Sequence, residues 1–307
     1  MSEKKNHNAA IAGGLLLTVI LWGGNNAGTK WLVSTGAWPP IFTGGTRFFV
    51  AGLILLAVLR FTNLLGRFES LTIEQYRSLW LRGGLSLAAY AISFTWAFKL
   101  TPASHVALYL GASPVWALLM EERPRADWSS VRRYGAALLA LSGVLVLFWP
   151  ALKTTGTNLA GELIALGASF LWTNFSHQSR ILAAKINGLE VAANSMWMAG
   201  ATLLPFALYE ARNGIKIDTQ HVWVQTFCIF LGSVVPYAFW NTALRHWLTS
   251  RVLLFNNLIP LTTTVWVYFT LGEAITPTFC VAMVLIIAGV LLGQVDWSKV
   301  FKQPESF

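Results

Sequence analysis

Ten long runs of apolar residues dominate this chain of 307 residues and limit the folds open to it. A helix needs about 20 apolar residues to cross the hydrocarbon core of a bilayer, and each run has roughly this length. We place the runs at residues 11–33, 39–60, 78–99, 103–120, 131–149, 159–182, 188–210, 221–244, 252–271 and 275–293. The sequence therefore predicts an all-α integral membrane protein with ten transmembrane helices.

The composition supports this fold class. Only 11% of the residues are charged and 55% are apolar, whereas about a quarter of the residues are charged in soluble domains. This balance excludes a water-soluble fold. Lys4 and Lys5 precede the first run, as in a signal peptide, but the run is about 23 residues long and no A-x-A-like cleavage site follows it. We expect an uncleaved first span.

The basic residues predict the orientation of the chain. If the N-terminus is inside, sixteen Lys and Arg residues fall on inner loops and tails and only four on outer loops. Because basic loops favour the cytoplasmic face, both termini are expected in the cytoplasm. The net charge of +9 then reflects contact with a membrane surface, with no role in binding nucleic acid. We expect a multi-pass protein of the cytoplasmic (inner) membrane, with the lipid bilayer as a partner.

The chain shows signs of internal duplication. An offset of 150 residues aligns Trp22 with Trp172 and Lys30 with Arg180. An offset of 146 residues aligns further pairs without a gap, namely Lys99 with Arg245, Ser104 with Ser250, Pro114 with Pro260, Asp127 with Glu273, and Gly143-Val144 with Gly289-Val290. Chance similarity between apolar segments is the alternative. We predict two five-helix repeats, at 1–150 and 151–307, which are inverted because five spans is an odd number.

Several short motifs in a fixed order carry a family resemblance. They are Trp22-Gly23-Gly24, Pro39-Pro40, Arg47, Pro114, Gly143-Val144, Pro260, Gly272-Glu273 and Gly289-Val290. The chain resembles the EamA-type branch of the drug/metabolite transporter superfamily, although Ala126-Asp127 replaces the usual Gly-Glu after the fourth span. The resemblance implies a ten-helix inverted-repeat fold with cytoplasmic termini, a central substrate cavity, and secondary transport, often export of amino acids or other small metabolites.

Polar and aromatic side chains recur at helical spacing inside the predicted spans. Polar groups are unfavourable in hydrocarbon, so they should face a cavity or hydrogen-bond a neighbouring helix. Aromatic walls with amides suit a small ligand with an apolar or aromatic side chain, or a cation over a ring. The expected substrate-binding residues are Trp22, Asn25, Asn26, Tyr90, Trp96, Tyr109, Trp172, His177, Tyr237, Trp240, Asn241, Asn256 and Asn257.

Charged and titratable residues are scarce within the spans. Lys30 and Arg180 could bind a substrate carboxylate or reach the lipid headgroups. Asp and Glu are confined to span ends, which argues against a carboxylate proton relay, and His105 and His177 are the remaining groups that titrate near neutral pH. Exchange, facilitated diffusion and proton antiport stay open as coupling mechanisms.

The function classes can be ranked from these patterns. We expect an alternating-access carrier that exports small amphipathic metabolites, with amino acids first and organic cations or drugs as the alternative. A membrane-embedded enzyme or lipid-handling protein would need clustered catalytic residues, and a channel is a third class. Cys228 and Cys280 lack metal-ligand spacing, so no metal or cofactor is expected. Small residues such as Gly143 should pack spans 131–149 and 275–293 together, or form a homodimer contact.

Overall fold

The structure is a computed structural model that describes residues 2–34, 38–62, 70–111, 113–120, 128–153, 158–247, 252 and 254–294. All regular structure in these residues is helical, as the sequence predicts. In chain order the segments are α1 (Ser2–Ser34), α2 (Pro40–Phe61), α3 (Ile73–Ser78), η1 (Leu79–Gly84), α4 (Leu85–Leu100), α5 (Ala103–Gly111), α6 (Ser113–Met120), α7 (Trp128–Lys153), α8 (Leu159–Ala183), α9 (Gly188–Glu210), η2 (Ala211–Asn213), α10 (Thr219–Ile229), η3 (Phe230–Val234), α11 (Val235–His246), η4 (Leu254–Leu258), α13 (Ile259–Leu271) and α14 (Pro277–Gln294).

Helical structure falls on each of the ten predicted segments, although four segments contain more than one element. The π-helical turns η1 and η3 interrupt the third and eighth segments. The fourth segment is divided between α5 and α6, and the ninth starts as the 3-10 helix η4. Within the described residues, four helical stretches are long and apolar enough to cross a membrane, namely Asn8–Ser34, Pro40–Phe61, Gly188–Asn213 and Thr219–His246.

Short polar signals set where several helices begin. Thr72 and Gln75 form a capping box at the start of α3. Three further helices begin with a side-chain cap. In each, a side-chain oxygen accepts a hydrogen bond from a backbone N–H group in the first turn of the helix that follows; the capping residues are Asn158, Asn187 and Asp218. Hydrogen bonds from the backbone and ring of His221 lower the pKa of Asp218 to about 2, so this cap stays ionised down to that pH.

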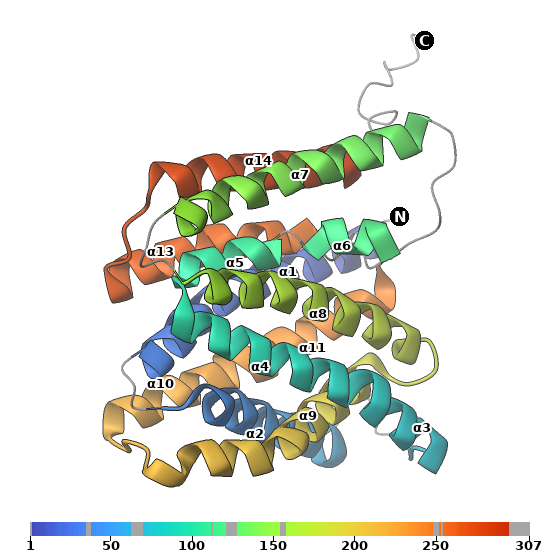
Figure 1. Cartoon of the computed structure of the whole chain (residues 1–307). Coiled ribbons are helices and arrows are strands. Elements are labelled where there is room, and N and C mark those ends of the chain that lie inside the picture. Colours follow the sequence, from blue (N-terminus) through green and yellow to red (C-terminus); the bar gives the residue numbers. More distant parts are fainter. Residues whose placement is uncertain are drawn as a thin grey trace, which may run out of the picture.

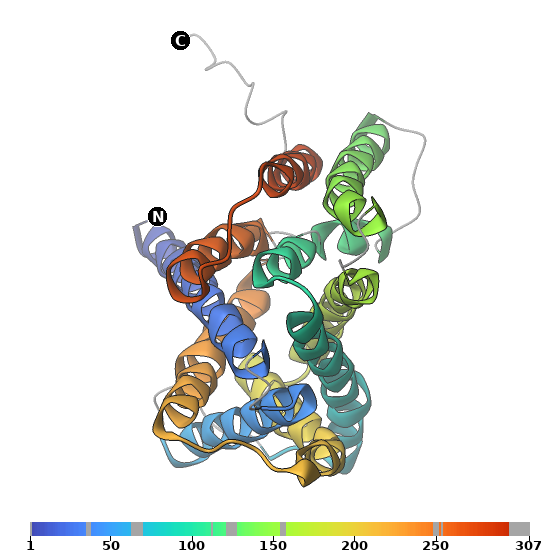
Figure 2. The ribbon, with the colours of Figure 1, turned by 60° about the vertical axis from the view of Figure 1, so that its left-hand side comes forward.

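The helices form a bundle with a distinct pair on each of two opposite sides. Figures 1 and 2 show α7 and α14 together on one side and α2 crossing α9 on the other. Between these pairs, α4 packs on α8 and α1 packs on α11. In the same region α1 packs on α13, while α8 packs on α5 and α6. Segments from residues 1–150 and 151–307 therefore interleave through the centre.

Glycines allow the closest helix contacts. A Cβ atom on Gly52 would lie 2.2 Å from the backbone nitrogen of Trp197, and one on Gly200 would lie 2.4 Å from the Cα atom of Phe49. Gly143 plays the same part between α7 and α14, where a Cβ atom would lie 2.8 Å from the carbonyl oxygen of Ala282. The expected contact between spans 131–149 and 275–293 thus forms within one chain.

Candidate functional site

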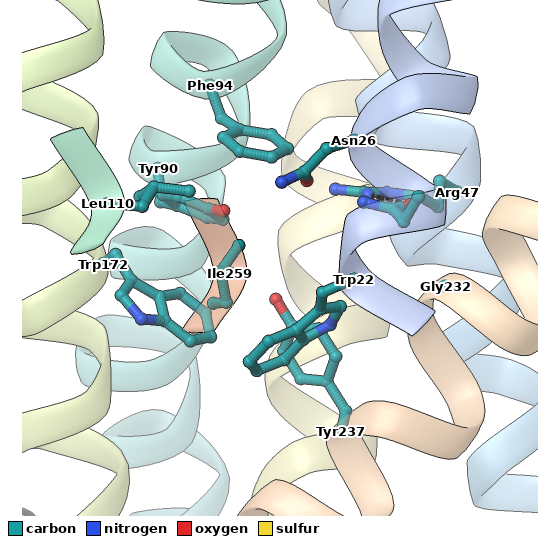
Figure 3. A pocket seen from close by; sticks show the side chains of 11 residues that line it. Trp22, Asn26, Arg47, Tyr90, Phe94, Leu110, Trp172, Gly232, Tyr237 and Ile259 are labelled. Atoms are coloured by element: carbon teal, nitrogen blue, oxygen red, sulfur yellow. Dashed lines mark hydrogen bonds between the residues drawn. The ribbon is translucent and has the colours of Figure 1, made fainter. Parts of the chain in front are cut away.

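A small cavity lies at the centre of the bundle, where segments of both halves of the chain meet (Figure 3). Its volume is about 20 Å³, which leaves room for roughly one water molecule. The residues that line it are Trp22, Asn25, Asn26, Arg47, Tyr90, Phe94, Leu110, Trp172, Gly232, Tyr237 and Ile259. This set combines aromatic rings with two amides and one guanidinium group.

Aromatic rings in mutual contact form one part of the cavity wall. The centre of the Trp22 ring lies 5.4 Å from that of Trp172, with the ring planes perpendicular, and 5.8 Å from that of Tyr237. The ring centre of Tyr90 lies 5.1 Å from that of Trp172. These are favourable edge-to-face and tilted contacts. The rings offer apolar surface and, on their faces, a negative potential that suits a cationic group.

Polar groups gather on the opposite part of the wall. Figure 3 shows Asn26 and the guanidinium of Arg47 facing the cavity across from Trp172, with Trp22 and Tyr237 below. The Nη1 atom of Arg47 donates a 2.6 Å hydrogen bond to the Oδ1 atom of Asn25. The amide nitrogen of Asn26 donates to the hydroxyl of Thr263 at 2.8 Å. These bonds fix a polar end opposite the aromatic one.

Gly232, on the π-helical turn η3, makes room for the polar end. A Cβ atom at this position would lie 2.6 Å from the Oδ1 atom of Asn25. That oxygen is the acceptor for Arg47, so any larger residue would push the amide out of place. Glycine at this position therefore preserves the geometry of the polar end.

Arg47 carries a charge into the interior of the protein. Its side chain is 3% exposed, and its guanidinium carbon lies 4.4 Å from the ring centre of Phe48 and 5.8 Å from that of Phe94. Among the residues that the structure describes, no carboxylate lies within ion-pair distance of it. Its Nε atom is buried without a hydrogen-bond partner.

Six of the predicted binding residues line the cavity: Trp22, Asn25, Asn26, Tyr90, Trp172 and Tyr237. Trp240 lies behind them, fully buried, with its ring centre 5.0 Å from that of Trp22. The amide nitrogen of Asn241 donates to the carbonyl oxygen of Tyr237 in its own helix. Trp240 and Asn241 thus support the wall and do not reach the cavity.

Other predicted residues point elsewhere because the helical period carries them away. His177 follows Trp172 by five positions, about 140° around the helix, and is exposed on α8. Trp96 is half-buried, and the ammonium of Lys99 lies 4.9 Å from the centre of the Trp96 ring. Tyr109 is buried next to Glu162. The structure thus corrects the expectation that these three face the cavity.

Of the two amides predicted in span 252–271, Asn256 does not line the cavity. Asn256 is fully buried in η4, and neither its amide oxygen nor its nitrogen has a hydrogen-bond partner. The side chain of Asn257 lies outside the described residues.

Neither basic residue predicted to meet a substrate carboxylate is at the cavity. The ammonium of Lys30 donates to the carbonyl oxygens of Phe98 at 2.8 Å and Thr101 at 2.9 Å. Lys30 therefore provides hydrogen bonds to carbonyl groups at the end of α4. The sequence had suggested contact with a substrate carboxylate or with lipid headgroups. Arg180 lies exposed in the last turn of α8.

We expect Lys30→Met to destabilise the protein without changing the shape of the cavity. Methionine keeps the apolar stem but leaves two carbonyl oxygens at the end of α4 without their charged donor. Hydrogen bonds of this kind contribute about 2 kcal/mol. A lower midpoint of thermal unfolding in detergent would match this role. An unchanged midpoint would mean that the ammonium instead resides among headgroups.

Two carboxylates hold the connection between α4 and α5. Glu162, at the start of α8, accepts hydrogen bonds from the hydroxyl of Thr101 and, at 2.8 Å, from the Nδ1 atom of His105. Glu273 accepts from the backbone N–H groups of Ala103 and Ser104 at 2.9 and 3.2 Å, and from the Ser104 hydroxyl. Both carboxylates come from residues 151–307 and bind a segment of residues 1–150.

Sequence reasoning did not assign five of the lining residues to the site. Arg47 had a signal, because it is a basic residue near the middle of the predicted span 39–60. The other four residues had no signal in the sequence, since apolar residues and glycine are common throughout the spans. They are Phe94, Leu110, Gly232 and Ile259.

Comparison with known proteins agrees with this architecture. The model of the EamA-like transporter family matches residues 10–149 and again residues 159–293. The chain belongs to the EamA-like transporter family. The resemblance seen in its motifs is thereby confirmed, and the protein is a membrane transporter.

Similar proteins cover nearly the whole chain at low identity. A probable amino-acid metabolite efflux pump of Salmonella typhimurium is 25% identical over 91% of this chain and 92% of its own length. A probable amino-acid metabolite efflux pump of Escherichia coli is 23% identical over 94% of this chain and 96% of its own length. A probable terminal-alkyne amino-acid exporter of Streptantibioticus cattleyicolor is 25% identical over 91% of each. The fold is also similar to that of a solved crystal structure, with a TM-score of 0.64. The match covers 93% of this chain and 97% of the other chain at 19% sequence identity.

Proposed function

We propose that this EamA-like transporter exports small amphipathic metabolites, amino acids above all, across the cytoplasmic (inner) membrane by alternating access. One observation carries the proposal: both halves of the chain contribute to a central cavity where aromatic rings face buried amides and a guanidinium. Amphipathic solutes have complementary apolar and polar ends. Similar proteins described as amino-acid exporters support this substrate class and this direction.

We further propose ten membrane spans in two inverted repeats, 1–150 and 151–307, with both termini in the cytoplasm. The helix contacts support this arrangement, because exchanging the halves turns the α4–α8 contact into the α1–α11 contact. The π-helical turns occur in the third span of each half. The two matches to the family model follow the same division. Repeats of this kind rock about a fixed central site in other carriers.

A transporter of organic cations or drugs is the second candidate. The ring faces of Trp22, Trp172 and Tyr237 would suit a cation. Arg47 weighs against it, because a guanidinium in the same cavity repels a positively charged solute.

Loss of the Trp22 ring should weaken transport. We expect Trp22→Ala, and separately Asn25→Ala, to raise the half-saturating substrate concentration a few-fold, in line with about 1 kcal/mol for a lost aromatic contact or hydrogen bond. The measurement is competition by a panel of amino acids, with choline included, against labelled amino acid uptake in proteoliposomes. Trp80→Ala is the control, because Trp80 is 53% exposed on η1.

Equal uptake by wild type and the Trp22→Ala, Asn25→Ala double variant, at matched protein density, would reject this cavity as the binding site. Flux of a sugar nucleotide or an inorganic ion without amino acid flux would overturn the substrate class and leave the carrier function in place.

A further inference from the structure

Arg47 is an unusual residue for the centre of a helical bundle. A charge buried in a medium of low dielectric constant is unfavourable unless an opposite charge or a full set of hydrogen bonds compensates it. A guanidinium has five N–H donors. The structure gives this one a single hydrogen bond, to the neutral oxygen of Asn25, and two aromatic neighbours. The described residues therefore leave most of its binding capacity unused.

We propose that Arg47 binds the carboxylate of the transported molecule and thereby restricts the substrates to amphipathic carboxylates such as free amino acids. This inference rests on the proposed transport function and narrows it. Arginine suits the role because its planar fork can donate two parallel hydrogen bonds to a carboxylate. Asn25 holds one arm of the fork at 2.6 Å, and Figure 3 shows the guanidinium at the cavity.

The arrangement of the cavity gives the substrate one orientation. With the carboxylate at Arg47, the remainder of an amino acid extends toward Trp172, which Figure 3 shows across the cavity, and toward Trp22 and Tyr237 below it. These rings can contact an apolar side chain, and their faces can contact the substrate ammonium. No described acidic residue lines the cavity. The site therefore provides a positive charge for the carboxylate but no negative charge that would retain a simple amine.

The two basic residues that the sequence offered for a substrate carboxylate are poorly placed for this task. The ammonium of Lys30 is engaged by two carbonyl oxygens at the end of α4, and Arg180 is exposed at the end of α8. Among the residues that line the cavity, Arg47 carries the one positive charge. A change at this position should therefore alter selectivity for the carboxylate, whereas changes at the other two should not.

The test compares three probes that share one side chain. In proteoliposomes with the full-length wild type, L-phenylalanine, L-phenylalaninamide and phenethylamine each compete against uptake of labelled L-phenylalanine. A matching leucine series is run in parallel. We expect the free amino acid to compete at least tenfold more strongly than its amide or amine. Equal competition by all three, with saturable uptake, would overturn the carboxylate role while leaving the carrier function intact. Absence of carrier-mediated uptake of every amino acid would overturn both.

Variants assign the preference to one side chain. Arg47→Gln removes the charge but keeps hydrogen-bonding groups, and should reduce the acid-to-amide preference to about one. Arg47→Lys keeps the positive charge but lacks the planar fork, so it should retain part of the acid-to-amide preference. Arg212→Gln is the matched control, because the guanidinium carbon of Arg212 also lies near an aromatic ring, 3.8 Å from the ring centre of Tyr209, but Arg212 is exposed in η2. It should keep the wild-type ratio.

The ratio of probe potencies does not depend on how much variant protein inserts correctly. A wild-type ratio in the Arg47→Gln variant would refute the assignment. If that variant yields no folded protein, the wild-type probe series and the Arg47→Lys ratio still decide the outcome.

Discussion

Substituting Gly200 by alanine is expected to disrupt the protein although it adds a single methyl group. That methyl would lie 2.4 Å from both the Cα and the nitrogen of Phe49, which are backbone atoms and cannot rotate away. In Gly52→Ala, the added methyl on α2 would clash with the backbone of Trp197 on α9. Either change must separate α2 from α9, where close contact between small residues holds the pair together. We expect a loss of about 3 kcal/mol in unfolding free energy.

Thermal unfolding of the purified variants in detergent, together with size-exclusion profiles, measures this effect. Gly13→Ala and Gly167→Ala serve as controls, because both positions are helical and a Cβ atom there meets nothing within 4 Å. Alanine favours helix over glycine, so the controls should match or slightly exceed wild-type stability. A Gly200→Ala midpoint equal to that of the controls would show that α2 and α9 are not in close contact.

The second large effect is expected at Glu162. Replacing it by alanine leaves the hydroxyl of Thr101 and the ring of His105 without their acceptor in a buried site. It also removes a link between residues 151–307 and the α4–α5 connection. Breaking a buried charged network of this size should cost about 2 to 4 kcal/mol of unfolding free energy.

The readout is again the midpoint of thermal unfolding, with Glu74→Ala as the control. Glu74 also lies in the first turn of a helix, but it is exposed. A near-wild-type midpoint for Glu74→Ala and a clearly lower one for Glu162→Ala is the expected pattern. Two equal midpoints would mean that Glu162 is solvated and not part of the buried network.

The helical segments could be located from the sequence because apolar length and caps define them locally. The predicted run at 188–210 coincides with α9, which begins after the cap at Asn187. The first run was predicted to start at residue 11, whereas α1 begins at Ser2. Polar residues continue that helix beyond its apolar part, and hydropathy alone does not detect them. The π-helical turns η1 and η3 also escaped prediction, since they keep the helical direction and the apolar composition.

The part of the candidate site that could be predicted follows patterns within single helices and the internal duplication. Trp22, Asn25 and Asn26 share a face of α1, and all three line the cavity. His177 was chosen as a polar residue near Trp172, but its position around α8 turns it outward. The role of Lys30 depends on which helix end lies beside α1. Contacts between distant segments set that position, and no local pattern encodes them.

The size of the central cavity has a kinetic consequence. A volume of about 20 Å³ cannot hold an amino acid, so the rings of Trp22, Trp172 and Tyr237 must separate before any solute enters. On the proposed route through this cavity, each molecule that crosses requires its own rearrangement of helices, which in proteins takes microseconds to milliseconds. Flux should accordingly saturate with concentration, rise steeply with temperature, and carry few water molecules per solute, in contrast to diffusion through a permanently open pore.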